Sequence, residues 1–332
     1  MTEMTAPVTF RSEIAGRVFD AIRTGESCSL VGVGSCGKSN IAWHLVNRKV
    51  VEHYLGEEAH QVLGVLVNCT KLADTTSPAL YRLILECLHD AVQQYSPIQG
   101  KIASHVEQKL VIATETNTGD LVRRALHDAI KHVFNTGIKR LFIVLDDFDH
   151  VVVGASSQTL NSLRALRDDY KPNLTYISLT RQELPCLRKE REFQDLCELL
   201  TPKTIPIGLY SEFDANSMID RLSNQWGMVP HLSRKERMQL ISLSGCHAGL
   251  LKALMIAHHD KSFSLAVDNP LPLLRKHKDV EPICYTIWES LEKTERDALA
   301  MWLKGIRPSE DGISLINCAT TGAHYSLIRG YG

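Results

Sequence analysis

An eight-residue segment near the N-terminus constrains the fold more than any other part of the chain. Residues 32–39, Gly-Val-Gly-Ser-Cys-Gly-Lys-Ser, match the pattern G-x-x-x-x-G-K-[ST] at every fixed position. Residues 28–31 before it read as a short buried strand, and residues 40–46 after it read as a helix. Glycines let the backbone curl until successive N–H groups face an anion, which also meets the positive end of the helix. The segment therefore predicts a phosphate-binding loop, and the alternative is an ordinary glycine-rich turn before a helix.

This loop predicts which residues would hold ATP and Mg²⁺. The Lys38 ammonium would reach the β- and γ-phosphates, and the Ser39 hydroxyl would bind Mg²⁺. Cys36 lies beside Lys38 and the start of a helix, which favours a thiolate, and an inert thiol shielded by the loop is the alternative. The expected cofactor-binding residues are Gly32, Gly34, Ser35, Cys36, Gly37, Lys38, Ser39 and Asn40.

Composition limits the class of protein. With 332 residues the chain exceeds the usual range of one domain, so we expect two or three. A hydrophobic content of 44% with a net charge of −1 fits a soluble protein with no global attraction to nucleic acid or membranes. The nine scattered cysteines form no C-x-x-C pair, which indicates free thiols. The N-terminus has no signal-peptide pattern and no apolar run reaches the ~18 residues of a membrane span, so we expect a cytoplasmic protein.

Apolar runs and amphipathic segments alternate through the first two thirds of the chain. The expected strands are residues 28–31, 62–69, 140–147, 174–179 and 204–208. The expected helices cover residues 8–25, 40–46, a segment from about residue 78, 121–133 and 157–168. Residues 96–118 are expected to form an insertion or mobile loop with a short helix near residues 105–110. This alternation predicts an α/β domain with a parallel sheet covered on both faces.

Beyond about residue 211 the pattern becomes helical throughout, which marks a second domain. Its expected helices are residues 211–225, 233–243 and 248–258. Residues 260–280 contain two closely spaced prolines and read as a linker, and a third element begins near residue 283. The sequence thus predicts a nucleotide-binding α/β domain over 1–210, a helical domain over 211–262 and a helical C-terminal element over 281–332.

A second chemical element lies about 110 residues after the loop. Residues 141–145 are apolar and are followed by Asp146 and Asp147. Ligands bind at the carboxyl ends of parallel strands, so we expect this acid on the strand adjacent to the one that leads into the loop. Asp146 would hold Mg²⁺, and Asp147 would accept a proton from the attacking water or orient it. The alternative is a solvated acidic turn, and Asp149 is interpreted as a surface charge.

A third element follows the next expected strand. Thr180 and Arg181 stand directly after residues 174–179, where a permanently charged guanidinium could sense a γ-phosphate. A surface ion pair is the alternative for Arg181. Arg188 and Arg191 could act on a nucleotide of a neighbouring subunit as an arginine finger, although a solvated helix face is favoured for them. The expected catalytic set is therefore Asp147, Lys38 and Arg181.

Together these residues resemble the AAA+/STAND branch of P-loop ATPases, close to origin-recognition-type and bacterial signalling ATPases. The loop, Leu145-Asp146-Asp147 and Ile177-Ser178-Leu179-Thr180-Arg181 are similar to its phosphate loop, acidic strand end and sensor. Residues 244–251 resemble its Gly-Gly-x-Pro-Gly-Leu-Leu stretch, with Cys246 and Ala248 as departures, and residues 10–13 partly match its Gly-Arg-Glu motif. The resemblance covers residues 8–260 and implies a helical lid followed by a winged-helix element, of which residues 285–299 look like the opening helices.

The resemblance implies an ATP-driven switch that hydrolyses ATP with Mg²⁺, moves its lid and assembles with itself or a protein partner. A DNA-associated ATPase of the replication-initiator or transposition-helper type is the alternative, and it requires a local surplus of Lys and Arg. A GTPase is disfavoured because no Asp-x-x-Gly follows the acidic strand, and Glu183 stands where an Asp would pair with guanine. A small-molecule kinase is disfavoured by the long helical C-terminal half.

Overall fold

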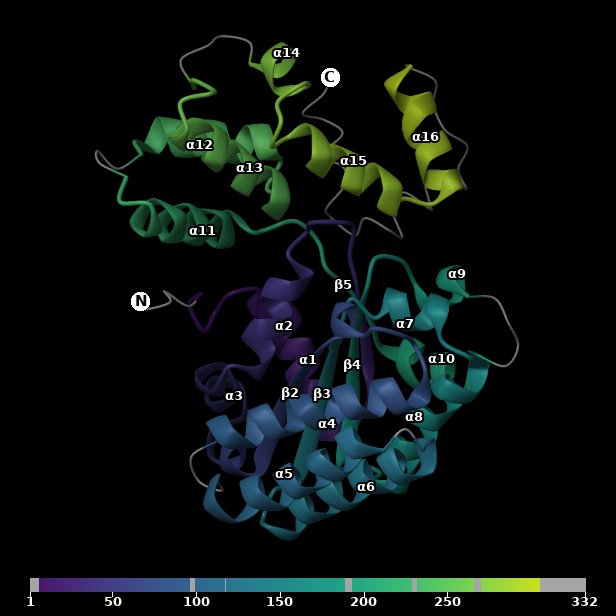
Figure 1. Ribbon diagram of the computed structural model, residues 1–332. Coiled ribbons are helices and arrows are strands. Elements are labelled where there is room, and N and C mark those ends of the chain that lie inside the picture. Colours follow the sequence, from purple (N-terminus) through teal and green to yellow (C-terminus); the bar gives the residue numbers. More distant parts are fainter. Residues whose placement is uncertain are drawn as a thin grey trace. The chain divides into compact units, whose positions relative to one another are not determined.

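The computed structural model describes residues 6–95, 99–116, 118–188, 193–228, 232–265 and 270–304 (Figure 1). The chain divides into two compact units. The sheet unit consists of residues 12–31 and 39–205. The helical unit combines residues 6–11, the loop residues 32–38 and the described residues from Pro206 onward. The phosphate-loop residues therefore group with the helical unit, although they directly continue the first strand of the sheet.

A five-stranded sheet forms the centre of the sheet unit. Its strands are β1 (Cys28–Val31), β2 (Val62–Asn68), β3 (Arg140–Asp146), β4 (Leu174–Thr180) and β5 (Thr204–Pro206). They lie in the order β2-β3-β4-β1-β5, and the ladders β2–β3, β3–β4 and β4–β1 are all parallel. The predicted parallel sheet is thereby confirmed, and all five expected strands are present.

Helices connect the strands of the sheet unit, as parallel pairing requires. They are α1 (Ser12–Thr24), α2 (Lys38–Val46), α3 (Arg48–Leu55), α4 (Ser77–Gln94), α5 (Gln99–Glu115), α6 (Gly119–Asn135), α7 (Asp149–Gly154), α8 (Ser157–Asp169), α9 (Leu184–Leu187) and α10 (Gln194–Leu200). Capping interactions determine where a helix begins. At the start of α4, the Thr76 side chain accepts a hydrogen bond from the Ala79 N–H, and a proline occupies the first turn.

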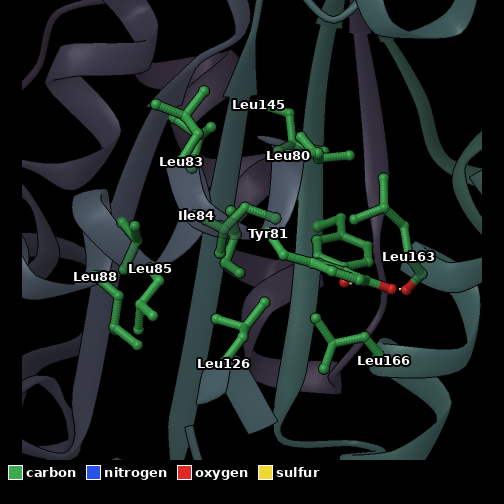
Figure 2. Close-up of a cluster of buried hydrophobic side chains, with 14 of the residues drawn as sticks. Leu80, Tyr81, Leu83, Ile84, Leu85, Leu88, Leu126, Leu145, Leu163 and Leu166 are labelled. Atoms are coloured by element: carbon green, nitrogen blue, oxygen red, sulfur yellow. Dashed lines mark hydrogen bonds between the residues drawn. The ribbon is translucent and has the colours of Figure 1, made fainter. Parts of the chain in front are cut away.

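Alternate side chains of the strands fill a core on each face of the sheet. On one face, residues of β2, β3 and β4 pack with α4, α5, α6, α8 and α10 in one continuous hydrophobic cluster. Figure 2 shows part of it, with Leu80 of α4 beside Leu145 of β3, and with Ile84 of α4 and Leu126 of α6 progressively further along the sheet. On the other face Phe142 meets Phe19 of α1 edge to face, with ring centroids 6.3 Å apart. Layers on both faces make this a three-layer α/β unit.

The helical unit has its own core. Its helices are α11 (Glu212–Gln225), α12 (Arg234–Ser244), α13 (Ala248–His259), α14 (Leu271–Leu274), α15 (Glu281–Ser290) and α16 (Lys293–Leu303). Ser233 and Glu236 form a capping box at the start of α12, and Gly245 ends it in the left-handed region with φ 55°. Side chains of α11, α12 and α13 share one core with Phe10 and Tyr210. The expected helices 211–225, 233–243 and 248–258 are confirmed.

One expectation about an irregular segment was wrong. Residues 99–115 form one long helix, α5, where an insertion with a short helix was expected, because Ile102, Val106 and Ala113 give it a buried face against α4 and α6. The expected linker 260–280 contains the short helix α14. Residues 305–332, which the winged-helix expectation needs, lie outside the described residues. Among the helices the structure describes, none is long and apolar enough to cross a membrane.

Candidate functional site: the acidic strand end and the phosphate loop

The carboxyl ends of β1, β4 and β3 meet at one edge of the sheet. Val31, the last residue of β1, is in register with Thr180 of β4, and Leu145 of β3 is in register with Ser178. Asp146 therefore ends its strand at the same edge from which the chain continues into the loop. The expectation that the two strands are adjacent was wrong: β4 lies between them. β4 pairs with β3 on one side and with β1 on the other, so it satisfies backbone groups of both strands.

The two consecutive aspartates occupy different environments. Asp146 is 2% exposed, and its Oδ1 accepts a hydrogen bond of 3.1 Å from the Asp147 N–H. Asp147 has a φ of 52°, in the left-handed region that an aspartate tolerates better than most residues. The Phe148 N–H then donates to the Leu179 carbonyl at 3.0 Å, which fixes the turn to the end of β4. The backbone thus directs the first carboxylate into the sheet edge and turns the second out of line with the strand.

Asp149 and Arg181 are joined in a way the sequence did not reveal. The Arg181 N–H donates to Asp149 Oδ1 at 2.8 Å, and Asp149 is half-buried rather than the surface charge expected. The Arg181 residue itself is exposed. This contact ties the first turn of α7 to the residue that follows β4.

Thr180 presents a buried hydroxyl at that edge. The residue is fully buried, and its Oγ1 has no hydrogen-bond partner among the residues that the structure describes. A buried hydroxyl without a partner costs free energy, and the hydroxyls of Ser29 in β1 and Ser178 in β4 are in the same state. Ser39, at the start of α2, is exposed, as is Asn40.

The phosphate loop has the backbone form its glycines predict. Ser35 and Gly37 have φ of 59° and 98°, two left-handed positions that curl the loop. The Lys38 side chain is 7% exposed, and its Nζ donates to the carbonyls of Gly32 and Val33 at 2.7 and 2.9 Å. The lysine therefore lies along its own loop.

Residues of the helical unit donate hydrogen bonds to the next three carbonyls of the loop. His247 Nε2 lies 3.2 Å from the Gly34 oxygen, and because its Nδ1 accepts from the Leu250 N–H, Nε2 carries the proton and donates. The Gly249 N–H, in the first turn of α13, donates to the Ser35 oxygen at 2.9 Å. The Arg11 guanidinium donates to the Cys36 oxygen at 2.9 Å. We call His247, Gly249 and Arg11 the carbonyl clamp.

The clamp explains a glycine in the sequence that resembles the lid motif. A Cβ added to Gly249 would lie 2.6 Å from the Ser35 Cβ and 3.0 Å from its oxygen, so only glycine lets α13 approach the loop this closely. The departures at Cys246 and Ala248 leave this contact intact.

Sequence reasoning missed the role of Arg11. Its guanidinium also donates to the Gly208 and Leu209 carbonyls at 2.6 and 2.9 Å, and it lies 4.5 Å from the centre of the Tyr210 ring. Burial lowers the pKa of this guanidinium from its ordinary value. The partial Gly-Arg-Glu match at residues 10–13 was the available signal, and the structure gives that arginine a part in holding the loop.

Two further expectations concern Cys36 and Arg188. Cys36 is 2% exposed, and burial raises the pKa of its thiol despite Lys38 and Arg11 nearby, which favours the inert, shielded thiol over the thiolate. Arg188 donates to the Val152 and Ala155 carbonyls at 3.2 and 2.5 Å, contacts within its own unit that differ from both an exposed finger and a solvated face. Arg191 lies outside the described residues.

Comparisons with solved structures identify the fold. One similar structure is the Walker-type ATPase PABY2304 of Pyrococcus abyssi, with 15% identity over 94% of this chain and 88% of that chain and a TM-score of 0.52. Another is the Aeropyrum pernix ORC2 protein, with 14% identity over 96% of this chain and 81% of that chain in its ADP form and a TM-score of 0.53. No family model matches the chain, and no curated protein matches it either. The chain therefore has the fold of AAA+ P-loop ATPases.

Proposed function

We propose that the chain is an ATP-binding and ATP-hydrolysing switch of the AAA+/STAND type. The observation that carries this proposal is the sheet edge at which the strand leading into the phosphate loop, the buried Asp146 and the unpartnered Thr180 hydroxyl end together. Backbone amides can bind anionic groups, and a buried carboxylate and a hydroxyl can bind a cation, so this strand edge suits a ligand that carries both.

The loop would bind the phosphates of ATP through its amides and Lys38. The clamp is compatible with this assignment, because its three contacts use carbonyl oxygens of the loop and none of its N–H groups. Ser39 and Asp146 would hold Mg²⁺; hydroxyl and carboxylate oxygens are the ligands this ion prefers. Mg²⁺, when bound, neutralises charge on the transferred phosphate.

Three residues of the strand edge would serve hydrolysis. Asp147 would orient the attacking water and accept its proton, since its left-handed turn directs it away from the strand. Thr180 and Arg181 would sense the γ-phosphate, and the hydrogen bond from the Arg181 N–H to Asp149 fixes the backbone at that position. We thus assign phosphate binding to the loop and ATP hydrolysis to the sheet edge.

The switch would act through the contacts between the loop and the rest of the helical unit. Arg11, His247 and Gly249 hold the carbonyl side of the same peptide groups whose amide side would bind phosphate. A change in the loop upon hydrolysis would therefore be felt by the helical unit, which serves as the lid. The output would be association with another copy of the chain or with a protein partner.

Nucleotide binding and turnover test this proposal. ATP affinity by calorimetry and Mg²⁺-dependent phosphate release should both be measurable in the wild type and should lose most of their magnitude in Lys38→Ala. Lys49→Ala, an exposed lysine of α3, is the matched control. ATP binding by Lys38→Ala that equals wild type contradicts the assignment of the loop.

Separate measurements distinguish ATP from GTP as the nucleotide, and self-association from DNA binding as the output. ATP should compete with a labelled nucleotide more strongly than GTP does. Size-exclusion chromatography with and without ATP and Mg²⁺ reports self-association. A DNA-associated ATPase would instead show a DNA mobility shift that weakens steeply with salt.

A further inference from the structure

The last residue of α15 contacts the phosphate loop directly. The Gly34 N–H donates to the Ser290 hydroxyl oxygen at 2.7 Å, and Ser290 is 6% exposed. The two residues are separated by 256 positions in the chain but belong to the same compact unit. One amide of the loop is therefore occupied by a side chain of the protein itself.

The Ser290 hydroxyl acts here as an acceptor. Its own proton is directed back into its helix, where the Thr286 and Ile287 carbonyls lie 2.5 and 3.0 Å from Oγ. A hydroxyl has one proton and two lone pairs, so the side facing Gly34 carries a lone pair. Chemically the loop amide meets an oxygen acceptor of the kind that a phosphate group presents.

The contact leaves no space for a phosphate group between Gly34 and α15. A Cβ added to Gly34 would lie 2.5 Å from Thr286 Cγ2, 2.7 Å from the Thr286 oxygen and 2.9 Å from Ser290 Oγ. These distances are below van der Waals contact, so the helix backbone already rests on the loop. Phosphate binding at the Gly34 amide and the Ser290 contact exclude one another.

The carbonyl clamp does not compete with phosphate in this way. His247 and the Gly249 N–H donate to the Gly34 and Ser35 oxygens, and a phosphate oxygen cannot replace a donor. Of the described contacts from α13 and α15 to the loop, only the one from Ser290 uses a group that a nucleotide needs. Nucleotide binding should therefore move the end of α15 and leave the start of α13 in place.

We propose that Ser290 is an internal competitor for the phosphate site, and that residues 286–290 must leave Gly34 before a nucleoside triphosphate fills the loop. This inference rests on the proposed nucleotide-binding function and adds its regulation. Coupling is reciprocal, so anything that holds the end of α15 against the loop weakens ATP binding, and anything that removes it strengthens binding.

The Ser290→Ala variant tests the competition. It removes the acceptor, leaves the Gly34 N–H without a partner in the closed form, and should tighten ATP binding by about threefold to tenfold. Ser244→Ala is the matched control, because Ser244 is also buried and its hydroxyl also donates to a carbonyl of its own helix, that of Ile241. ATP affinity of Ser244→Ala should stay within twofold of wild type. Equal affinities of Ser290→Ala and wild type overturn the inference while leaving the proposed function intact.

Hydrogen exchange on the wild-type protein gives a second test that needs no variant. Saturating ATP with Mg²⁺ should raise amide exchange in residues 286–290 and leave residues 249–254 of α13 unchanged. Unchanged exchange in 286–290 with nucleotide demonstrably bound overturns the inference, whatever the folding of Ser290→Ala. A wild-type protein that binds no nucleotide refutes the proposed function itself, which is a different outcome.

Discussion

The acidic strand end and the phosphate loop are held in place by different means. Backbone ladders fix the strand end: the register of β3 on β4 and of β4 on β1 determines where Asp146 and Thr180 stand. The loop depends on side chains and amides from remote parts of the chain, at Arg11, His247, Gly249 and Ser290. A rigid edge suits chemistry that needs fixed geometry, whereas a loop held by separable contacts suits a switch.

The largest expected effect concerns the strand end alone. Asp147→Asn should bind ATP as wild type does but turn it over about 10²–10⁴-fold more slowly, the magnitude that a positioned general base supplies. Steady-state phosphate release together with calorimetry separates the two quantities. Asp90→Asn, on the exposed face of α4, is the control and should keep wild-type turnover. Full activity of Asp147→Asn would place the base elsewhere.

Removing Arg11 should weaken the loop and spare the sheet edge. Arg11→Met leaves three carbonyls without their charged donor, and we expect a loss of about 2–3 kcal/mol in the free energy of unfolding of the helical unit. Arg17→Met in α1 is exposed and should change stability little. Urea unfolding followed by the tryptophans measures both variants. Equal stabilities would show that the guanidinium contacts contribute nothing.

Adding one methyl group to Gly249 should separate α13 from the loop. Gly249→Ala brings a Cβ to 2.6 Å from Ser35 Cβ, and overpacking of this kind costs about 1–3 kcal/mol. Gly16→Ala is the contrasting variant: its Cβ would meet nothing nearer than 4.0 Å within helix α1, so it should gain about 0.5–1 kcal/mol. Thermal unfolding of the two variants measures their change in stability relative to wild type. If both changes had the same sign, the close approach of α13 to the loop at Gly249 would be contradicted.

The smallest expected effect belongs to the sheet unit far from the loop contacts. Partial burial raises the pKa of Asp168, but hydrogen bonds from Lys171 and Arg164 outweigh it and lower the pKa to about 2. The unfolded value is near 3.8, so the stabilisation is present above about pH 4 and is lost as the pH falls toward 2. After solvent screening we expect less than about 1 kcal/mol. Asp168→Asn should flatten this part of the stability profile, and a profile unchanged from wild type would contradict it.

The sheet and its acidic edge could be predicted from the sequence because their signals are local. The apolar run 141–145 ends in an acid, and the glycine pattern fixes the loop, without reference to any distant residue. The position of β4 between β1 and β3 could not be predicted, since strand order is set by long-range pairing that no local residue pattern indicates.

The contacts of the loop were beyond sequence reasoning for a related reason. Arg11, His247 and Ser290 carry no local pattern that indicates a partner 25, 213 or 256 residues away. The long helix α5 was missed because polar residues separate its apolar ones, so the sequence pattern does not reveal its buried face. The residue-level roles of Lys38, Ser39, Asp146, Asp147 and Arg181 remain predictions for the measurements above.

The placement of Arg11 has a practical consequence for the N-terminus. A truncated protein that begins at Ser12 would keep every strand and every helix of the sheet, yet it would lose the guanidinium that holds the Cys36 carbonyl. Such a truncation should leave the sheet unit folded but should weaken the attachment of the phosphate loop. Through Arg11, the segment before the first helix therefore connects the loop to the start of the helical unit at Gly208 and Leu209.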